Sequence, residues 1–135
     1  VLEIRLEGTS GLLRNVDAMN SLVFALLEGA SEALGVRRDD IDGTLYFRDY
    51  GAPPSIILYD TTPGGSGHVE QIRRKLREAA EAAQTKVKAC SCGEDTSCYN
   101  CLRNYRNQRF HDRLRRGYAI HLLEAMLGKS ASKTR

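Results

Sequence analysis

The chain has 135 residues, of which 41% are hydrophobic and 27% charged, and this composition suits one globular domain with a real hydrophobic core. It contains neither an apolar run of bilayer-spanning length nor a signal peptide, which argues against a membrane protein and favours a reducing, cytoplasmic compartment. The first residue, Val1, opens directly into a strand-like pattern, so we expect a fragment of a larger protein.

The net charge of +3 hides an asymmetry between the two halves of the chain. Residues 1–70 carry five Lys or Arg against eleven Asp or Glu, a balance of −6. Residues 71–135 carry fifteen against six, a balance of +9. The basic half is suited to an anionic partner, with DNA or another nucleic acid as the leading candidate. A merely solvated basic surface is the alternative.

The first half combines strands with one long helix. Residues 1–6 show the period-two alternation of a half-buried strand. Residues 15–34 carry apolar side chains at every third or fourth position, which predicts an amphipathic helix closed by Gly35. Two further strands are expected at residues 44–47 and 55–60. The last is the most hydrophobic, so we predict that it is central in a small, at least partly antiparallel sheet.

A glycine-rich turn follows the third strand and leads into a helix predicted at residues 67–88. Glycine backbone beside a helix N-terminus suits an anion, so the candidate anion-binding residues are Gly64, Gly65, Ser66 and Gly67. A purely structural turn is the alternative. The turn lacks the Lys-Ser/Thr ending of a P-loop, and the neighbouring Asp60 and His68 have no third catalytic partner. We therefore predict no catalytic residues in this chain.

All the cysteines fall within twelve positions, written as C-x-C, five residues and C-x-x-C: Cys90, Cys92, Cys98 and Cys101. A disulfide framework would spread its cysteines along the chain, whereas this clustering suits four thiolates that converge on one tetrahedral ion. We predict a structural Zn²⁺ site with these four ligands. Two local disulfides or a redox C-x-x-C pair are the alternatives, although a redox pair would leave the other two cysteines unexplained.

Five of the arginines that follow the cysteines are the candidate nucleic-acid-binding residues: Arg103, Arg106, Arg109, Arg113 and Arg116. On one continuous helix they would form a stripe of planar guanidinium groups, each able to donate two hydrogen bonds to a phosphate. A break near residues 110–112, with Asp112 as the N-cap of a second helix, would scatter that stripe. His111 is expected to make a structural hydrogen bond, because four thiolates already complete a tetrahedron.

Two motifs follow one another between residues 59 and 111, and the leading strand and long helix precede them in a fixed order. They are Tyr59-Asp60-x-x-Pro63-Gly64-Gly65-x-Gly67 and, after the C-x-C pair, Ser97-Cys98-x-x-Cys101-Leu102-Arg103-x-Tyr105-Arg106-Asn107-Gln108 with His111. Together they resemble the zinc-binding domain at the C-terminus of MrfA-like superfamily 2 DNA helicases, a domain type also found in the DrmB protein of the DISARM anti-phage system. The resemblance implies that the four cysteines hold a metal and that the ATPase motor lies elsewhere. This chain contains none of the helicase motifs.

We therefore expect an α+β domain over residues 1–128, in which a small sheet packs against long helices beside a four-cysteine zinc knot. A flexible tail is expected at residues 129–135. The expected function is that of a non-catalytic accessory domain, which stabilises a DNA helicase or an anti-phage helicase complex and contacts DNA. Its partner would be a helicase motor domain in the same chain or in another subunit. A protein-docking module without nucleic-acid contact is the alternative.

Overall fold

The computed structural model of the chain describes residues 1–6, 11–48, 51–61 and 67–132, with side chains as far as Gly128. The predicted anion-binding residues Gly64, Gly65 and Ser66 lie outside the described residues. The α+β class is confirmed, and the elements follow in the order β1 (Leu2–Ile4), η1 (Gly11–Arg14), α1 (Val16–Leu34), η2 (Arg38–Asp40), β2 (Ile41–Tyr46), β3 (Ser55–Asp60), α2 (His68–Arg74), α3 (Leu76–Ala89), η3 (Tyr105–Arg113) and α4 (Arg116–Ser132).

The three strands form an antiparallel sheet in the order β1-β3-β2, so the most hydrophobic strand is central, as predicted. Strand β2 begins at Ile41, three positions before the predicted start at residue 44. The Asp-Gly pair at its beginning would normally indicate a turn. Gly43 instead allows close packing inside the sheet, because a Cβ there would lie 2.7 Å from Leu58 Cδ2 and 2.9 Å from Val23 Cγ1.

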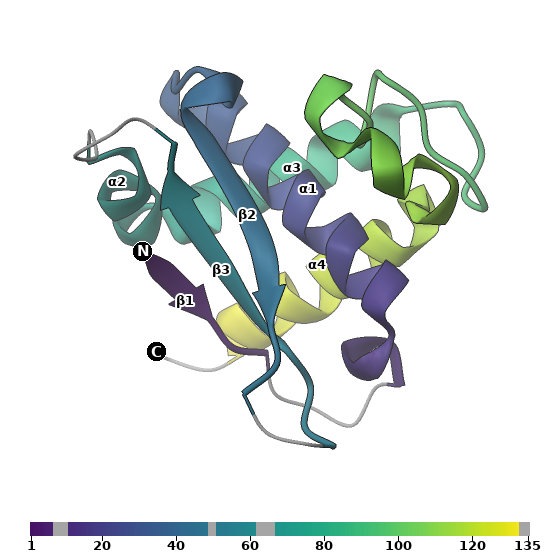
Figure 1. Cartoon of the computed structure of the whole chain (residues 1–135), viewed down its shortest axis with the longest axis horizontal. Coiled ribbons are helices and arrows are strands. Elements are labelled where there is room, and N and C mark those ends of the chain that lie inside the picture. Colours follow the sequence, from purple (N-terminus) through teal and green to yellow (C-terminus); the bar gives the residue numbers. More distant parts are fainter. Residues whose placement is uncertain (7–10, 49–50, 62–66, 133–135) are drawn as a thin grey trace.

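Helix α1 begins after Asn15, whose Oδ1 accepts a hydrogen bond from the Ala18 N–H at 3.0 Å, and ends at Gly35 with φ 68°. These bounds agree with the predicted helix and its glycine cap. The amphipathic prediction was wrong, since residues 18–27 are buried without interruption. The reason is visible in Figure 1, where α1 crosses the middle of the molecule between the sheet and helices α3 and α4. Core contacts therefore surround it.

The helix predicted at residues 67–88 is two helices, α2 and α3, which meet at Lys75. Lys75 has φ −121° and ψ 37°, outside the helical range, and its N–H donates to the oxygens of both Gln71 and Ile72. The break redirects the chain. Helix α2 packs against β1 and β3, whereas α3 packs against α1.

A close helix crossing joins α1 to α3. A Cβ on Gly29 would lie 2.3 Å from the Ala79 oxygen and 2.7 Å from Ala83 Cβ, so only glycine fits here without displacing backbone. Lys86 on α3 pairs with two carboxylates of α1, at 3.5 Å from Glu28 and 3.0 Å from Glu32. These contacts fix the C-terminal end of α3, from which the cysteine segment starts.

The chain after residue 101 also departs from prediction at its helix boundaries. Element η3 consists of two short helical pieces that meet at a kink at Asn107, with φ −107° and ψ 26°. A second break follows at Leu114 and Arg115, so Asp112 is not the N-cap of α4. Helix α4 extends from Arg116 to Ser132. Among the described residues, none of the helices combines the length and apolar character that crossing a membrane requires.

Candidate metal centre

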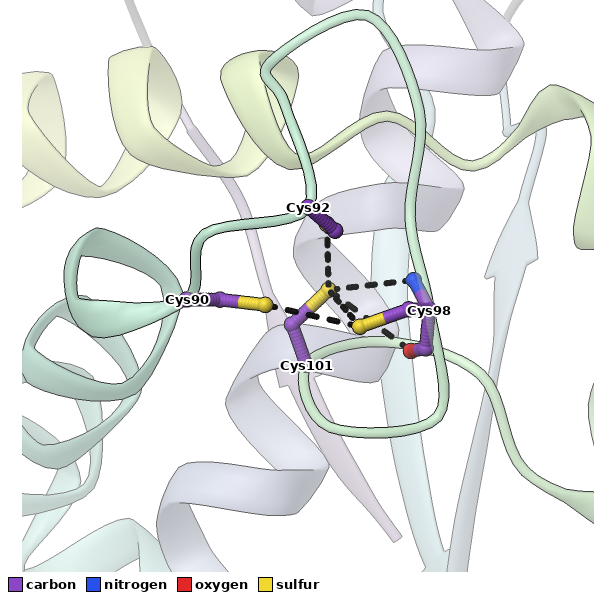
Figure 2. Close-up of side chains that lie close together, drawn as sticks. All are labelled: Cys90, Cys92, Cys98 and Cys101. Atoms are coloured by element: carbon purple, nitrogen blue, oxygen red, sulfur yellow. Dashed lines mark hydrogen bonds between the residues drawn. The ribbon is translucent and has the colours of Figure 1, made fainter.

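The sulfur atoms of the four cysteines, which lie in the chain between α3 and η3, converge on one point (Figure 2). All four lie within 4.8 Å of one another, with 3.4 Å between Cys90 and Cys98, 3.8 Å between Cys92 and Cys101 and 4.0 Å between Cys98 and Cys101. Four sulfurs at the Zn–S bond length around a tetrahedral ion are about 3.8 Å apart. The cluster thus has the size of a tetrahedral zinc site, and all four thiols are free.

Local backbone structure places each pair of cysteines. Cys90 is the C-cap of α3 in extended conformation, and Gly93, with φ 97°, turns the chain just after Cys92. In the second pair, the oxygen of Cys98 accepts hydrogen bonds from the N–H groups of residues 101, 102 and 103 at 3.2, 3.1 and 3.0 Å. The turn presents Cys98 and Cys101 to the same point, and the fully buried Leu102 anchors it in the core.

Backbone N–H groups also point at the sulfurs. The N–H of Asn100 donates to Cys98 Sγ at 3.3 Å, and the N–H of Cys98 donates to Cys101 Sγ at 3.4 Å. Burial raises the pKa of the Cys101 thiol well above its usual value. Burial also opposes ionisation of Cys90, but hydrogen bonds from the Cys92 backbone and the other thiols outweigh it and lower the Cys90 pKa to about 7.

The pKa of Cys101 is thus raised whereas the pKa of Cys90 is lowered, and the two shifts bear on which ion the cluster can bind. Burial and the charge of neighbouring thiols both disfavour ionisation of Cys101, and a cation at the centre of the cluster would compensate that charge. A divalent ion supplies that charge, and Zn²⁺ prefers thiolate ligands in tetrahedral geometry. The donor set therefore fits zinc in charge, softness and spacing.

Comparison with known proteins gives the same assignment. Residues 22–102, which include all four cysteines, match the model of the MrfA Zn-binding domain family. The chain belongs to this family. Its structural cofactor is zinc, as predicted.

Two relatives place this zinc-binding domain in larger proteins. The Druantia protein DruE of Escherichia coli (strain UMEA 4076-1) is 30% identical over 129 residues, which covers 82% of this chain but 7% of DruE. The crystal structure of the DUF1998 helicase MrfA bound to DNA matches with a TM-score of 0.55 and 21% identity, over 81% of this chain and 13% of MrfA. The chain thus spans only a small part of either protein, and the match to MrfA establishes a shared fold. The resemblance to an MrfA-type zinc domain is confirmed.

The five predicted nucleic-acid-binding arginines do not share one stripe, because the 3-10 helix and the turn after it separate them. Arg109 and Arg113 are exposed. Arg106 is exposed and donates to the oxygen of Asp39 at 3.1 Å. Arg103 is half-buried and donates to Ser97 Oγ at 2.8 Å.

Arg116, the fifth, is only 7% exposed. It links the cysteine loop, residues 90–101, to α3 and α4. Its guanidinium donates to the oxygens of Val87 at 2.8 Å and Gly93 at 3.2 Å, and its N–H donates to the Thr96 oxygen at 2.8 Å. The N–H of Gly117 adds a bond to the Glu94 oxygen at 2.9 Å. Such a side chain presents no surface to a phosphate, so Arg116 is corrected from a nucleic-acid contact to a clamp on the cysteine loop.

The sequence analysis missed a hydrogen-bonded corner at the start of η3. Asn104 and Asn107 form a capping box, in which Asn104 Oδ1 accepts from Asn107 N–H at 3.1 Å and Asn107 Oδ1 accepts from Asn104 N–H at 2.8 Å. The spacing of the two asparagines is the signal that could have revealed it. His111 Nε2 donates to the Asn104 oxygen at 3.0 Å, which confirms its predicted structural role.

The Asp60 and His68 pair is also structural. Asp60 Oδ1 accepts the backbone N–H of His68 at 3.1 Å and so caps the start of α2. The His68 ring faces another carboxylate, with Nε2 at 3.8 Å from Asp40 Oδ2. The described part of the glycine-rich turn is Gly67, whose φ of 81° suits glycine. The side chain of Asp60 is therefore committed to the helix cap.

Proposed function

We propose that Cys90, Cys92, Cys98 and Cys101 ligate one structural Zn²⁺, and that the domain is a non-catalytic accessory module of a DNA helicase or an anti-phage helicase complex. The module stabilises that assembly and contacts the DNA backbone. The observation that carries the proposal is the convergence of four sulfurs at tetrahedral spacing directly before an exposed arginine segment. Four thiolates leave the metal no open position for water or substrate, so its role is to hold the chain together.

The proposed structural role follows from which elements the cysteine loop connects. The zinc would tie the end of α3 to the start of η3 through its two pairs of ligands. Arg116 would tie the same loop to the start of α4. The metal and the clamp together would fix the orientation of η3 relative to the core. This requires four reduced thiols, which suits the cytoplasm.

The proposed DNA contact rests on the exposed arginines Arg106, Arg109 and Arg113. Guanidinium groups match phosphate oxygens in geometry and remain charged at any physiological pH. The helicase MrfA, with which this chain shares its fold, was crystallised with bound DNA. DNA is therefore the polyanion to test. The motor would lie in other parts of the parent protein or in a partner, because this chain holds a small share of the length of its relatives.

The experiment measures DNA binding of the 135-residue chain at several salt concentrations. Changing Arg106, Arg109 and Arg113 to Glu should weaken binding at least tenfold and lower the slope of log K against log salt, because phosphate contacts are lost. The matched control changes Arg74, Lys75 and Arg77 to Glu, an equal charge change at the exposed junction of α2 and α3 on the other side of the molecule (Figure 1). Equal weakening by both variants would contradict a contact at η3.

Protein docking without DNA contact is the second candidate function. Its supporting observation is two exposed aromatic side chains in the acidic half of the chain. Tyr46, the last residue of β2, is 48% exposed, and Phe47, which follows it, is 59% exposed. Unaltered DNA affinity of the Arg106, Arg109 and Arg113 variant would favour this function.

A further inference from the structure

Two tyrosines, one within the second cysteine pair and one shortly after it, expose most of their side chains. Tyr99 lies between Cys98 and Cys101 and is 63% exposed, and Tyr105, the first residue of η3, is 82% exposed. An aromatic ring has a large apolar face that is stabilised by being covered. Two such faces on the segment that carries the arginines therefore mark a contact surface.

Both tyrosines are attached to one rigid corner. Asn104, directly before Tyr105, accepts the N–H groups of Arg106 and Asn107 at 2.8 and 3.1 Å, which fixes the backbone on both sides of the ring. The ring of Tyr99 packs edge-on against His111, with 5.3 Å between ring centroids and 85° between planes. His111 in turn donates to the Asn104 oxygen. Because the segment is ordered before any ligand arrives, binding costs less conformational entropy.

Several arginines lie close to these tyrosines in the sequence. Arg103 and Arg106 stand two and one positions from Tyr105, and the exposed Arg109 and Arg113 follow on η3. Within η3 the acidic side chain is that of Asp112. Aromatic faces interleaved with guanidinium groups are the arrangement by which proteins bind single strands, because bases stack on the rings while phosphates pair with the cations. In a duplex the bases already cover one another's faces.

We infer that Tyr105, assisted by Tyr99, stacks on the bases of single-stranded DNA, while the arginines of η3 hold its phosphates. This inference rests on the proposed DNA contact and specifies its substrate as a single strand. Stacking would be tolerant of sequence, since every base offers an aromatic face.

The first test uses the absence of tryptophan from this chain. Tyr105→Trp introduces a single indole, whose emission should be quenched when an oligothymidylate of about 12 nucleotides stacks on it. Tyr46→Trp is the matched control, an exposed aromatic position at the far end of β2. Bound oligothymidylate without quenching at residue 105, or with equal quenching at residue 46, would overturn the inference.

The second test separates this inference from the proposed function. Tyr105→Ala should weaken single-strand binding about tenfold or more and leave duplex affinity and the salt slope unchanged, whereas Tyr105→Phe should retain single-strand affinity. Unchanged single-strand affinity in Tyr105→Ala, together with loss in the Arg106, Arg109 and Arg113 variant, means phosphate contact without stacking. The inference then fails and the proposed function stands. If the unmodified chain does not bind DNA, both the stacking inference and the proposed DNA contact are wrong. That result is expected if the surface binds a protein partner.

Discussion

Residues 1–89 and residues 90–115 are stabilised by different interactions. The first region buries large apolar side chains, among them Met19, Leu22, Leu26, Ile56 and Leu58, each at most 1% exposed. In the second region the buried apolar residues are Cys101, Leu102 and Leu114, and polar Ser97 and Asn107 are buried beside them. The difference teaches that the hydrophobic effect orders the core, whereas directed hydrogen bonds, together with the proposed zinc, order the segment proposed to bind DNA.

The largest expected effect comes from Cys98→Ser, which removes a ligand. We expect zinc to fall from one per chain to almost none, with a loss of about 5 kcal/mol or more of stability, because zinc binding contributes directly to folding. Metal analysis and thermal unfolding measure both, and hydrogen exchange should show residues 97–113 opening before α1 and β3. Ser91→Ala, at an exposed position of the same loop, should retain zinc. A well-folded Cys98→Ser chain without zinc would refute the proposed role.

A substitution in the first region should have the opposite pattern. Gly29→Ala places a Cβ against the backbone of α3 and should cost about 3 kcal/mol by overpacking, with zinc still at one per chain. Gly128→Ala is the control, since a Cβ there meets no atom within 4 Å. Denaturant unfolding gives the difference. Loss of zinc from folded Gly29→Ala would show that the two regions are not independent.

The smallest of the three effects is expected at their junction. Arg116→Met removes two guanidinium hydrogen bonds to backbone oxygens and should cost about 2 kcal/mol, with faster zinc release to a chelator. Arg115→Met is the matched control, because Arg115 is exposed with its guanidinium over the Tyr118 ring. Equal rates of zinc release from both variants would indicate that Arg116 does not stabilise the cysteine loop.

The sequence was most informative where structure depends on near neighbours. The clustering of the four thiols could be predicted because the cysteines are close in the chain and the chemistry of a Zn²⁺ site restricts the residue types that suit it. The central position of β3 and the cap at Gly35 followed from hydrophobicity and glycine geometry. The zinc site and the fold class were therefore accessible before the structure.

Features that depend on distant contacts were not accessible. Arg116 continues the spacing of the other arginines, but the extended Leu114, with φ −82° and ψ 127°, turns the chain so that Arg116 meets Val87 and Gly93. The break at Lys75 likewise arises because α2 and α3 pack on different partners. The periodicity of a short sequence cannot predict which carbonyl oxygen of another helix a side chain will contact. It also cannot predict which helix will pack against the sheet.

The short span of the cysteine cluster also bears on the order of folding. Cys90 and Cys101 are only eleven positions apart, so closing the loop between them costs little chain entropy. Arg116 comes later in the chain than all four cysteines, and the pairing of β1 with β3 brings together residues more than fifty positions apart. If the proposed zinc site forms, all four of its ligands are therefore available during synthesis before the clamp exists. The cysteine loop would then be formed before α4 packs against it.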